Sequence, residues 1–278
     1  MMNLFHEVSR LCSKATTEKY STSFSSAIKL LHPDLRTPIY NIYGFVRFAD
    51  EIVDTFHEYD KATLLAEFKK ETYTAIKREI SLNPILHSFQ ETVNKYHISP
   101  ELIDAFFNSM EMDLTQSDYT SEKYQEYIYG SAEVVGLMCL YIFCEGNIEM
   151  YNILKPYAQS LGAAFQKVNF LRDAKADYQQ LSRTYFPGVD FSNFTSCSKK
   201  KIEEDIATDF ANAYKGITQL PQKARFGVYV AYKYYLTLFN KIKKAQPKSI
   251  LHQRFRIPNY GKAFILAKAS LRAQLNIL

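Results

Sequence analysis

Tryptophan is absent from the 278-residue chain, and glycine and proline are scarce, with nine residues of each. So few turn-forming residues argue against a loop-rich or low-complexity chain and favour long regular elements. The aromatic residues are instead 21 Tyr and 20 Phe, which can line a deep apolar cavity or simply fill a core. Apolar residues make up 47% of the chain and charged residues 23%, which is the balance of a globular domain and not of a disordered chain.

Long apolar runs are also missing. The longest, residues 134–144, is far shorter than the roughly 20 residues that cross a bilayer, so any membrane association is expected to be peripheral. We find no secretory signal, and the few cysteines lack paired metal-site spacing, so we expect reduced thiols in a cytoplasmic protein. These cysteines are Cys12, Cys139, Cys144 and Cys197. The six histidines show no ligand spacing either, and surface roles are expected for His6, His32, His57, His87, His97 and His252.

The net charge is +5, with basic residues dispersed along the chain. The one dense group, Lys199 to Lys201, is followed at once by Glu203, Glu204 and Asp205, which is typical of a solvated helix start and not of a nucleic-acid patch. No nucleic-acid partner is therefore expected. The mild positive balance suits an anionic substrate or an anionic membrane surface.

Helical periodicity dominates the chain, and no segment alternates with a period of two for long enough to build a sheet. A helix that Asp34 can cap carries apolar residues as far as Val53. Further helices are expected around 61–80, 100–116, 121–144, 148–178, 200–218, 222–245 and 259–276, with an irregular loop at 183–198. The pattern predicts an all-α protein with a single domain over residues 1–278.

Two segments carry aspartates four residues apart on helices whose neighbouring positions are strongly apolar. Each residue of an α-helix advances about 100° around the axis, so positions three and four apart share a face. One face, which we call the first stripe, carries Tyr43, Arg47, Asp50 and Asp54. The other, the second stripe, carries Gln166, Asn169, Asp173 and Asp177.

Like charges at this spacing repel, and carboxylates that share an apolar interior need cations. Mg²⁺ takes one or two carboxylates together with substrate phosphates, so the two stripes are expected to face each other across Mg²⁺ and a diphosphate. Arg47 and Arg172 could bind phosphate oxygens. For a single Asp pair a solvated helix face is the better interpretation, and it is the repetition of the pattern that favours a site.

At these residues the chain resembles the squalene/phytoene synthase family. Its first motif, Arg-x-x-Asp-(Asp/Glu)-x-x-Asp, is matched by residues 47–54, and its second, Asn-x-x-Arg-Asp-x-x-x-Asp, by residues 169–177. Further matches are Ser21-Thr22-Ser23-Phe24, Met110-Glu-Met-Asp113-Leu114, Tyr129-Gly-Ser-Ala-Glu-Val-Val-Gly136, Arg183-Thr-Tyr185-Phe186-Pro187 and, loosely, Arg254-Phe-Arg256. Two features depart from the pattern: Glu133 stands where many members have glycine, and the spacing from Asp177 to Tyr185 is one residue longer than in the commonest pattern.

The resemblance implies an isoprenoid synthase-type helical bundle around a central cavity. It also implies the head-to-head condensation of two geranylgeranyl diphosphates to phytoene through a cyclopropyl diphosphate intermediate, in carotenoid biosynthesis. The alternative is a squalene or dehydrosqualene synthase that uses two farnesyl diphosphates, and a non-catalytic scaffold on the same fold is a third. Mg²⁺ is the implied cofactor, with Mn²⁺ as an alternative, and NADPH is not expected. Because the product is a hydrocarbon, a peripheral membrane contact is expected too.

The resemblance also assigns roles to residues. The catalytic residues it implies are Asp50, Asp54, Asp173, Asp177 and Tyr129, and the metal ligands are Asp50, Asp54, Asn169, Asp173 and Asp177. The implied substrate-binding residues are Ser21, Ser23, Phe24, Tyr43, Arg47, Gln166, Asn169, Arg172, Tyr185, Tyr235 and Arg254. A cyclase or head-to-tail prenyltransferase shares this helical, carboxylate-based chemistry, but its acidic motifs are usually denser or asymmetric.

Overall fold

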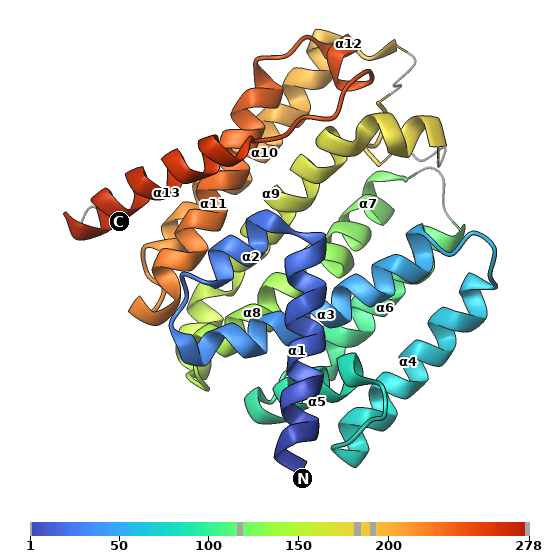
Figure 1. Ribbon diagram of the computed structural model, residues 1–278. Coiled ribbons are helices and arrows are strands. Elements are labelled where there is room, and N and C mark those ends of the chain that lie inside the picture. The colour runs from blue at the N-terminus through green and yellow to red at the C-terminus, as the bar shows by residue number, and fades with distance from the viewer. Residues whose placement is uncertain (1, 116–118, 181–184, 190–192, 276–278) are drawn as a thin grey trace.

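The computed structural model describes the chain except for residues 1, 116–118, 181–184, 190–192 and 276–278, and except for the side chains of residues 176–180. Within this described part the regular elements are all helical (Figure 1). They are α1 (Met2–Tyr20), α2 (Thr22–Ile28), α3 (Pro33–Asp54), α4 (Lys61–Arg78), α5 (Pro84–Tyr96), α6 (Pro100–Thr115), α7 (Ser121–Ile128), the π-helix η1 (Tyr129–Glu133), α8 (Val134–Phe143), α9 (Ile148–Gln180), α10 (Ser196–Ile217), α11 (Gln222–Lys243), α12 (Pro247–Ile250) and α13 (Asn259–Gln274).

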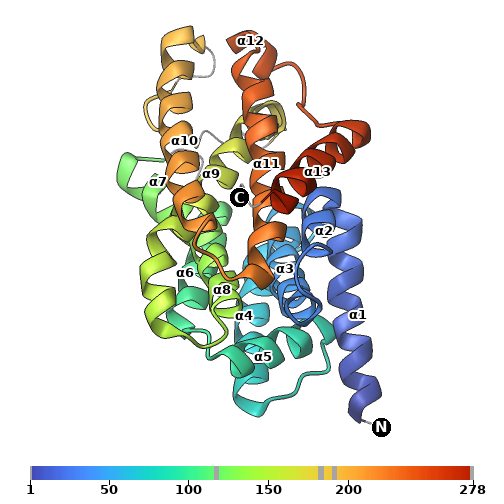
Figure 2. The ribbon, with the colours of Figure 1, turned by 90° about the vertical axis from the view of Figure 1, so that its left-hand side faces the viewer.

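The helices bury their apolar faces in two clusters. The first cluster draws mainly on α3, α4, α5, α6 and α8, and within it the rings of Phe45 and Phe89 stack with their centres 3.8 Å apart. The second draws mainly on α7, α9, α10 and α11, and it is richer in tyrosine. Helix α1 packs on α3 and α5, whereas α13 lies on the outside against α11 (Figures 1 and 2). The long helix α9 packs against α8, α10 and α11, so it connects the two clusters.

Local sequence signals set many of the helix ends. Side chains of Ser21, Asp60, Asn83, Thr120 and Thr195 cap the N-termini of α2, α4, α5, α7 and α10 by accepting a hydrogen bond from a backbone N–H group. Such a cap replaces a bond that the first turn of a helix cannot make internally. Proline occupies the first position of α3, α5 and α12, where it has no backbone partner to lose.

The expected all-α class is confirmed, and each expected helix is present to within a few residues. The prediction over 121–144 corresponds to α7, η1 and α8 in succession, with a π-helix in the middle. Helices α1, α2, α5 and α12 have no counterpart among the expected ranges. The start of α5 nevertheless carries local signals, because Asn83 caps it and Pro84 occupies its first position. Pro156 lies inside α9.

Two expectations about polar residues were wrong. Lys199 is buried and not solvated: it pairs with Glu203 and donates from Nζ to the carbonyl of Lys243 at 2.8 Å. His87 is also fully buried, in contact with His6. All four cysteines are free thiols, as expected. No helix in the described part of the chain is long and apolar enough to cross a membrane.

Candidate active site

A cavity of about 550 Å³ lies inside the bundle, between α2 and α3 on one side and α8, α9 and α11 on the other. Much of its wall is aliphatic or small, including Ile28, Leu31 and Ile42 from α2, the α2–α3 turn and α3, and Val135 and Leu161 from α8 and α9. Charged side chains also line it, and the carboxylates among them are Asp50, Asp54, Asp113 and Asp173. The cavity therefore combines a large apolar volume with a concentrated group of acids.

The first stripe faces this cavity as its spacing predicted. Tyr43, Arg47, Asp50 and Asp54 all line it, and they occupy successive turns of α3. Burial raises the pKa of Tyr43 to about 12, and the nearby charge of Asp50 adds to the rise. Tyr43 therefore keeps its hydroxyl proton at neutral pH and can donate a hydrogen bond into the cavity.

The carboxylates of the first stripe repel one another. Burial raises the pKa of Asp50 to about 8, and the charges of Asp54 and Asp113 raise it further than Arg47 can lower it. The Nη1 of Arg47 is 3.9 Å from Asp50 Oδ2, but its Nη2 pairs with Glu51, and its guanidinium lies 4.4 Å from the centre of the Tyr20 ring. A group of acids that favours protonation in this way is one that a cation would stabilise.

The second stripe enters the cavity from α9. Gln166, Asn169 and Asp173 line the cavity, and so does Arg172. The side chain of Asp177 lies outside the described residues, although its backbone continues α9. The prediction that two acidic helix faces meet one cavity therefore holds for every described member of both stripes.

Arginines balance the charge of Asp173. Arg172 bonds to it through Nε, at 3.1 and 3.0 Å from the two carboxylate oxygens, and through Nη2. Arg254 approaches from the segment between α12 and α13, with its Nε 2.7 Å from Asp173 Oδ1. The loosely assigned Arg254 thus reaches the site, and two guanidinium groups converge where a diphosphate could bind bidentately.

The amide of Asn169 lies in a short hydrogen-bonded chain. Its Nδ2 donates to Gln166 Oε1 at 3.4 Å, and its Oδ1 accepts from the Tyr235 hydroxyl at 3.3 Å. The ring of Tyr235 stacks on Phe165 at 3.9 Å between centres, and burial raises its pKa. These contacts fix the amide orientation, so Tyr235 of α11 holds the second stripe in place.

Three other residues expected at the site line the cavity, and two do not. Ser21, Phe24 and Tyr185 belong to its wall, with Tyr185 stacked on Phe170 at 4.0 Å despite the altered spacing before it. Ser23 and Tyr129 are not part of the wall. Tyr127 faces the cavity, and Tyr129 follows it by two residues, which turn a helix by about 200°. Tyr129 therefore points away from the cavity and packs against the first apolar cluster.

The sequence reasoning gave no role to three residues that the fold brings to the site. Tyr127 donates to Asp113 Oδ2 at 2.8 Å, and both line the cavity. Asp113 belongs to the Met-Glu-Met-Asp-Leu segment, so its motif was the available signal. Tyr20, which contacts Arg47, carries no comparable sequence signal because it comes from the end of a different helix.

Glu133 does not prevent close helix packing, because the small residue at this contact is Gly162 on the opposite helix, α9. A Cβ added at Gly162 of α9 would lie 2.6 Å from the Ala132 carbonyl oxygen and 3.0 Å from Glu133 Cα. The Glu133 carboxylate turns aside and accepts from Gln159 Nε2 at 2.8 Å, while burial raises its pKa. The π-helix η1 and Gly162 together allow α9 to approach closely enough to bring its stripe to the cavity.

The donor set fits a hard divalent cation. The ligand atoms available in the cavity are carboxylate oxygens of Asp50, Asp54 and Asp173 and the amide oxygen of Asn169, and Mg²⁺ prefers such oxygen ligands. At Asp50, burial and the charge of Asp54 raise the pKa, and the charge of Arg47 does not offset them. A metal between the two stripes would supply further positive charge.

Comparison with known proteins agrees with this site. The squalene/phytoene synthase family model matches residues 17–261, a span that includes both stripes. The chain belongs to the squalene/phytoene synthase family. It is therefore a prenyltransferase-type synthase that condenses prenyl diphosphates head to head, and the family in general depends on divalent metals.

Individual relatives are distant in sequence, but their matches extend over most of this chain. The 15-cis-phytoene synthase of Synechococcus elongatus is 27% identical, over 92% of this chain and 91% of its own length. Phytoene synthase 3 of Zea mays is 25% identical, and the match spans 97% of this chain but 66% of the maize protein. The 4,4'-diapophytoene synthase of Staphylococcus haemolyticus is also 25% identical, over 68% of this chain and 66% of its own length.

Solved structures show the same fold. A dehydrosqualene synthase superposes with a TM-score of 0.81 at 18% identity, covering 97% of this chain and 98% of that one. Squalene synthase HpnC from Alicyclobacillus acidocaldarius gives a TM-score of 0.73 at 20% identity, over 86% and 93% of the two chains. The bundle is therefore of the isoprenoid synthase type, as the resemblance implied.

Proposed function

We propose that this synthase joins two molecules of geranylgeranyl diphosphate to phytoene through a cyclopropyl diphosphate intermediate. The observation that carries the proposal is the meeting of two acidic stripes, each with an arginine, at one largely apolar cavity. Phytoene synthases among the relatives support the twenty-carbon substrate. Two farnesyl diphosphates, giving squalene or dehydrosqualene, are the alternative, supported by the 4,4'-diapophytoene synthase.

The acidic end of the cavity would bind the diphosphate groups. Mg²⁺, or Mn²⁺ in its place, would be held by Asp50, Asp54, Asn169, Asp173 and Asp177, and would neutralise the charge that develops on the departing pyrophosphate. Arg172 and Arg254 now bond to Asp173 and are placed to exchange that carboxylate for phosphate oxygens. Tyr43 and Ser21 line the same cavity and offer hydroxyl donors.

The apolar wall would hold the hydrocarbon chains and keep water away from the allylic carbocation. Such cations react rapidly with water, so the reaction needs a dry site. Phe24 and Phe165 lie on this wall, with their ring centres 5.9 Å apart. The ring centre of Tyr235 is 3.9 Å from that of Phe165 and 5.6 Å from that of Phe24. Aromatic faces in this arrangement can stabilise a passing positive charge.

Product analysis tests the proposal. Purified protein is incubated with Mg²⁺ and either geranylgeranyl or farnesyl diphosphate, with and without NADPH. We expect a linear forty-carbon hydrocarbon from the first substrate without NADPH. A thirty-carbon product alone would establish the alternative, and no hydrocarbon from either substrate would revive the non-catalytic scaffold.

We also propose that the protein binds the surface of an anionic membrane through α13. The outward face of this helix and the residue that ends it carry Tyr260, Phe264, Leu271 and Leu275, which are 81%, 71%, 58% and 59% exposed. Their spacing of four, seven and four residues keeps them on one side of the helix. An exposed apolar face with basic residues beside it is typical of a helix that lies in a membrane interface.

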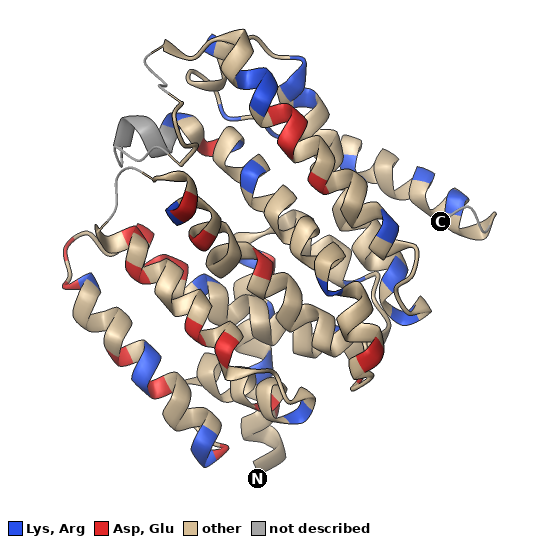
Figure 3. Ribbon diagram, turned by 180° about the vertical axis from the view of Figure 1, so that it is seen from behind, with Lys and Arg blue, Asp and Glu red and all other residues tan. Residues whose placement is uncertain are grey.

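The charge distribution supports the same surface. After Asp209 the sequence contains thirteen Lys and Arg but no Asp or Glu, so its C-terminal quarter is strongly basic although the whole chain carries only +5. Figure 3 shows the basic residues along α13 without acidic neighbours on that helix. Arg254 of this basic region also lines the cavity, so membrane binding would place the site near the lipid that must receive the product.

Flotation with vesicles of phosphatidylglycerol or phosphatidylcholine tests this surface. We expect flotation with the anionic vesicles, and loss of it when Phe264 and Leu271 are both changed to Ser. Leu82→Ser is the matched control, because Leu82 is 92% exposed in the α4–α5 connection. A protein that never floats, or that floats equally after the α13 changes, would contradict the proposal.

A further inference from the structure

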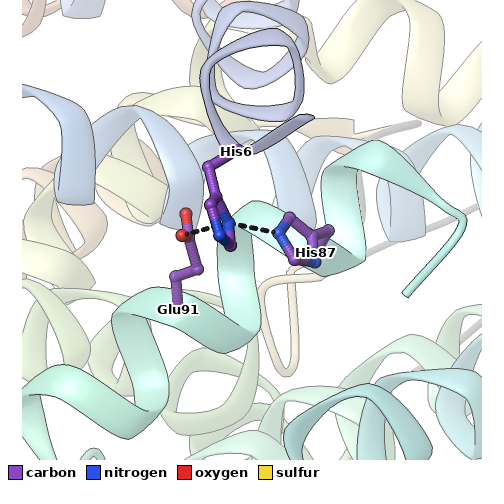
Figure 4. A group of neighbouring side chains, drawn as sticks. All are labelled: His6, His87 and Glu91. Carbon is purple, nitrogen blue, oxygen red and sulfur yellow. Dashed lines mark hydrogen bonds and ion pairs between the residues drawn. The ribbon is translucent and has the colours of Figure 1, made fainter. Parts of the chain in front are cut away.

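A second group of ligand-type side chains lies away from the cavity, where α1 crosses α5. Figure 4 shows His6 of α1 between His87 and Glu91 of α5. The Nδ1 of His6 is 2.8 Å from His87 Nε2 and 2.9 Å from Glu91 Oε1. One ligand atom from each of the three residues lies within 4.8 Å of the other two, although 81 positions separate the two histidines.

The group is shielded but reachable. His87 is fully buried, with the Phe5 ring packed on it at 4.6 Å between centres. The side chains of His6 and Glu91 are 27% and 19% exposed, so an ion could enter from solvent between them. Arg10, one turn after His6, donates to both oxygens of Glu91 at 3.0 and 2.9 Å and fixes the orientation of that carboxylate.

Hydrogen bonds alone do not satisfy these contacts. His87 Nδ1 accepts from the Ser81 N–H at 3.3 Å, so the neutral His87 ring carries its proton on Nε2 and donates it to His6 Nδ1. That nitrogen is then an acceptor, yet it faces an oxygen of Glu91, which as a carboxylate accepts only. A proton placed on His6 Nδ1 could be donated to Glu91, but it would then face the proton on His87 Nε2, and two donors cannot bond to each other.

A metal ion would remove the conflict, because it takes lone pairs from all three atoms at once. His87 would then carry its proton on Nδ1 and give up the long contact with Ser81, which lies in the connection between α4 and α5. Ligand atoms about 2.0–2.1 Å from a tetrahedral ion lie about 3.3 Å apart. The observed separations of 2.8 and 2.9 Å therefore need to open by only about half an ångström.

We propose that His6, His87 and Glu91 form a binding site for Zn²⁺ or a similar imidazole-binding divalent metal. Two imidazole nitrogens and one carboxylate oxygen are a donor set that suits zinc, in contrast to the oxygen-only set of the cavity. Arg10 acts as a positioning residue that holds the carboxylate toward the ion. The remaining coordination position would be taken by water.

The metal would clamp α1 to α5. Helix α1 ends at Tyr20, whose ring contacts Arg47 of the first stripe, and His6 lies about 21 Å away along the helix axis at 1.5 Å per residue. The clamp is thus remote from the reacting groups but lies on a helix that completes the cavity wall. A metal bound only by the folded protein also stabilises it by mass action.

Calorimetric titration of Zn²⁺ into the full chain, with excess Mg²⁺ to occupy the acidic cavity, tests the site. We expect one tight Zn²⁺ equivalent and a higher Tm with zinc. His6→Gln and Glu91→Gln should each weaken zinc binding at least about tenfold, which is the lower range for loss even of a supporting partner. His97→Asn is the matched control, since it removes an exposed imidazole from the end of the same helix, and Asn accepts the left-handed conformation found there.

A third variant addresses His87 directly. His87→Gln removes a buried ligand, so its fold is first checked by circular dichroism, and the half-exposed His6 and Glu91 variants decide the outcome if it does not fold. The ring-nitrogen NMR signals of His6 and His87 should shift on addition of Zn²⁺, while those of His97 stay in place. Absence of zinc binding, or binding that the His6 and Glu91 changes leave unaltered, would overturn the site. None of these readouts depends on prenyl transfer.

Discussion

The two stripes present similar acids to the cavity but neutralise them differently. On α3, Arg47 pairs with Glu51 and remains 3.9 Å from Asp50, whose pKa rises to about 8. On α9, Asp173 bonds to both Arg172 and Arg254. Asp50 of the first stripe therefore has less counter-charge than Asp173 of the second. We expect an added cation to neutralise the first, whereas the arginines beside Asp173 could turn to a diphosphate.

This difference suggests a division of work between the helices. Strained carboxylates such as those of the first stripe bind a metal with relief of repulsion. Arginines already placed beside a carboxylate can turn to phosphate oxygens with little loss of side-chain freedom. Removing the central carboxylate of either stripe should severely impair the reaction, but Asp50→Asn and Asp173→Asn should change the stability of the metal-free protein in opposite directions.

The largest effect is expected on activity. Asp50→Asn and Asp173→Asn should each lower kcat/KM at least about a thousandfold, because metal stabilisation of a transition state contributes several kcal/mol. Steady-state assays with excess Mg²⁺ measure this. Glu67→Gln is the control, because Glu67 is an exposed carboxylate on α4. Near-normal activity in either aspartate variant would contradict the assignment of that stripe.

The two arginines that bond to Asp173 should be less critical than the aspartates, and unequal to each other. Arg172→Gln should lower kcat/KM about a hundredfold, as does the loss of one preorganised donor to developing charge. Arg254→Gln should lower it about tenfold, because that side chain is 53% exposed against 24% for Arg172, and solvent screens its charge. Equal losses would show that the two guanidinium groups act as one unit.

Stability should distinguish the stripes most sharply. The folded pKa of Asp50 lies above its unfolded value, so ionised Asp50 disfavours the metal-free fold, progressively from about pH 4 and fully above about pH 8. Asp50→Asn should therefore raise Tm by a few degrees at pH 9 but not at pH 4. Asp173→Asn should lower Tm instead, since it leaves two arginines without their partner.

Thermal unfolding in the presence of a chelator measures both changes. Addition of Mg²⁺ should reduce the difference in Tm between wild type and Asp50→Asn, because the ion relieves the same repulsion that the substitution removes. A fall in Tm for both variants at pH 9 would show that the stripes do not differ in this way.

The smallest effects concern two tyrosines that donate hydrogen bonds to polar side chains of the cavity. Tyr127→Phe removes a hydroxyl that donates to Asp113 at 2.8 Å and should lower the free energy of unfolding by about 1–2 kcal/mol. Tyr235→Phe removes a longer bond to Asn169, of 3.3 Å, and should lower it by about 0.5 kcal/mol. Urea denaturation measures both losses in the free energy of unfolding. A larger loss for Tyr235→Phe would show that hydrogen-bond length does not set the size of the loss at these sites.

Much of the fold could be predicted because its signals are local. Periodicity gave most helices, and the stripe on α3 was read correctly because positions 43, 47, 50 and 54 share a face of any regular helix. Helix α5 was missed although Asn83 and Pro84 mark its start. Tyr129 was placed at the site because a motif does not show the π-helix that follows α7 or the direction in which its side chains point.

The sequence by itself determined the helices, the two acidic stripes and the kind of substrate they suit, because those depend on residue types at fixed helical spacing. Only the tertiary structure decided which side chains share a space. Arg254 meets Asp173, Tyr127 meets Asp113, and His6 meets His87 across 81 residues of chain. Such contacts arise from how helices cross, and close approaches like that of Gly162 to Ala132 set those crossings.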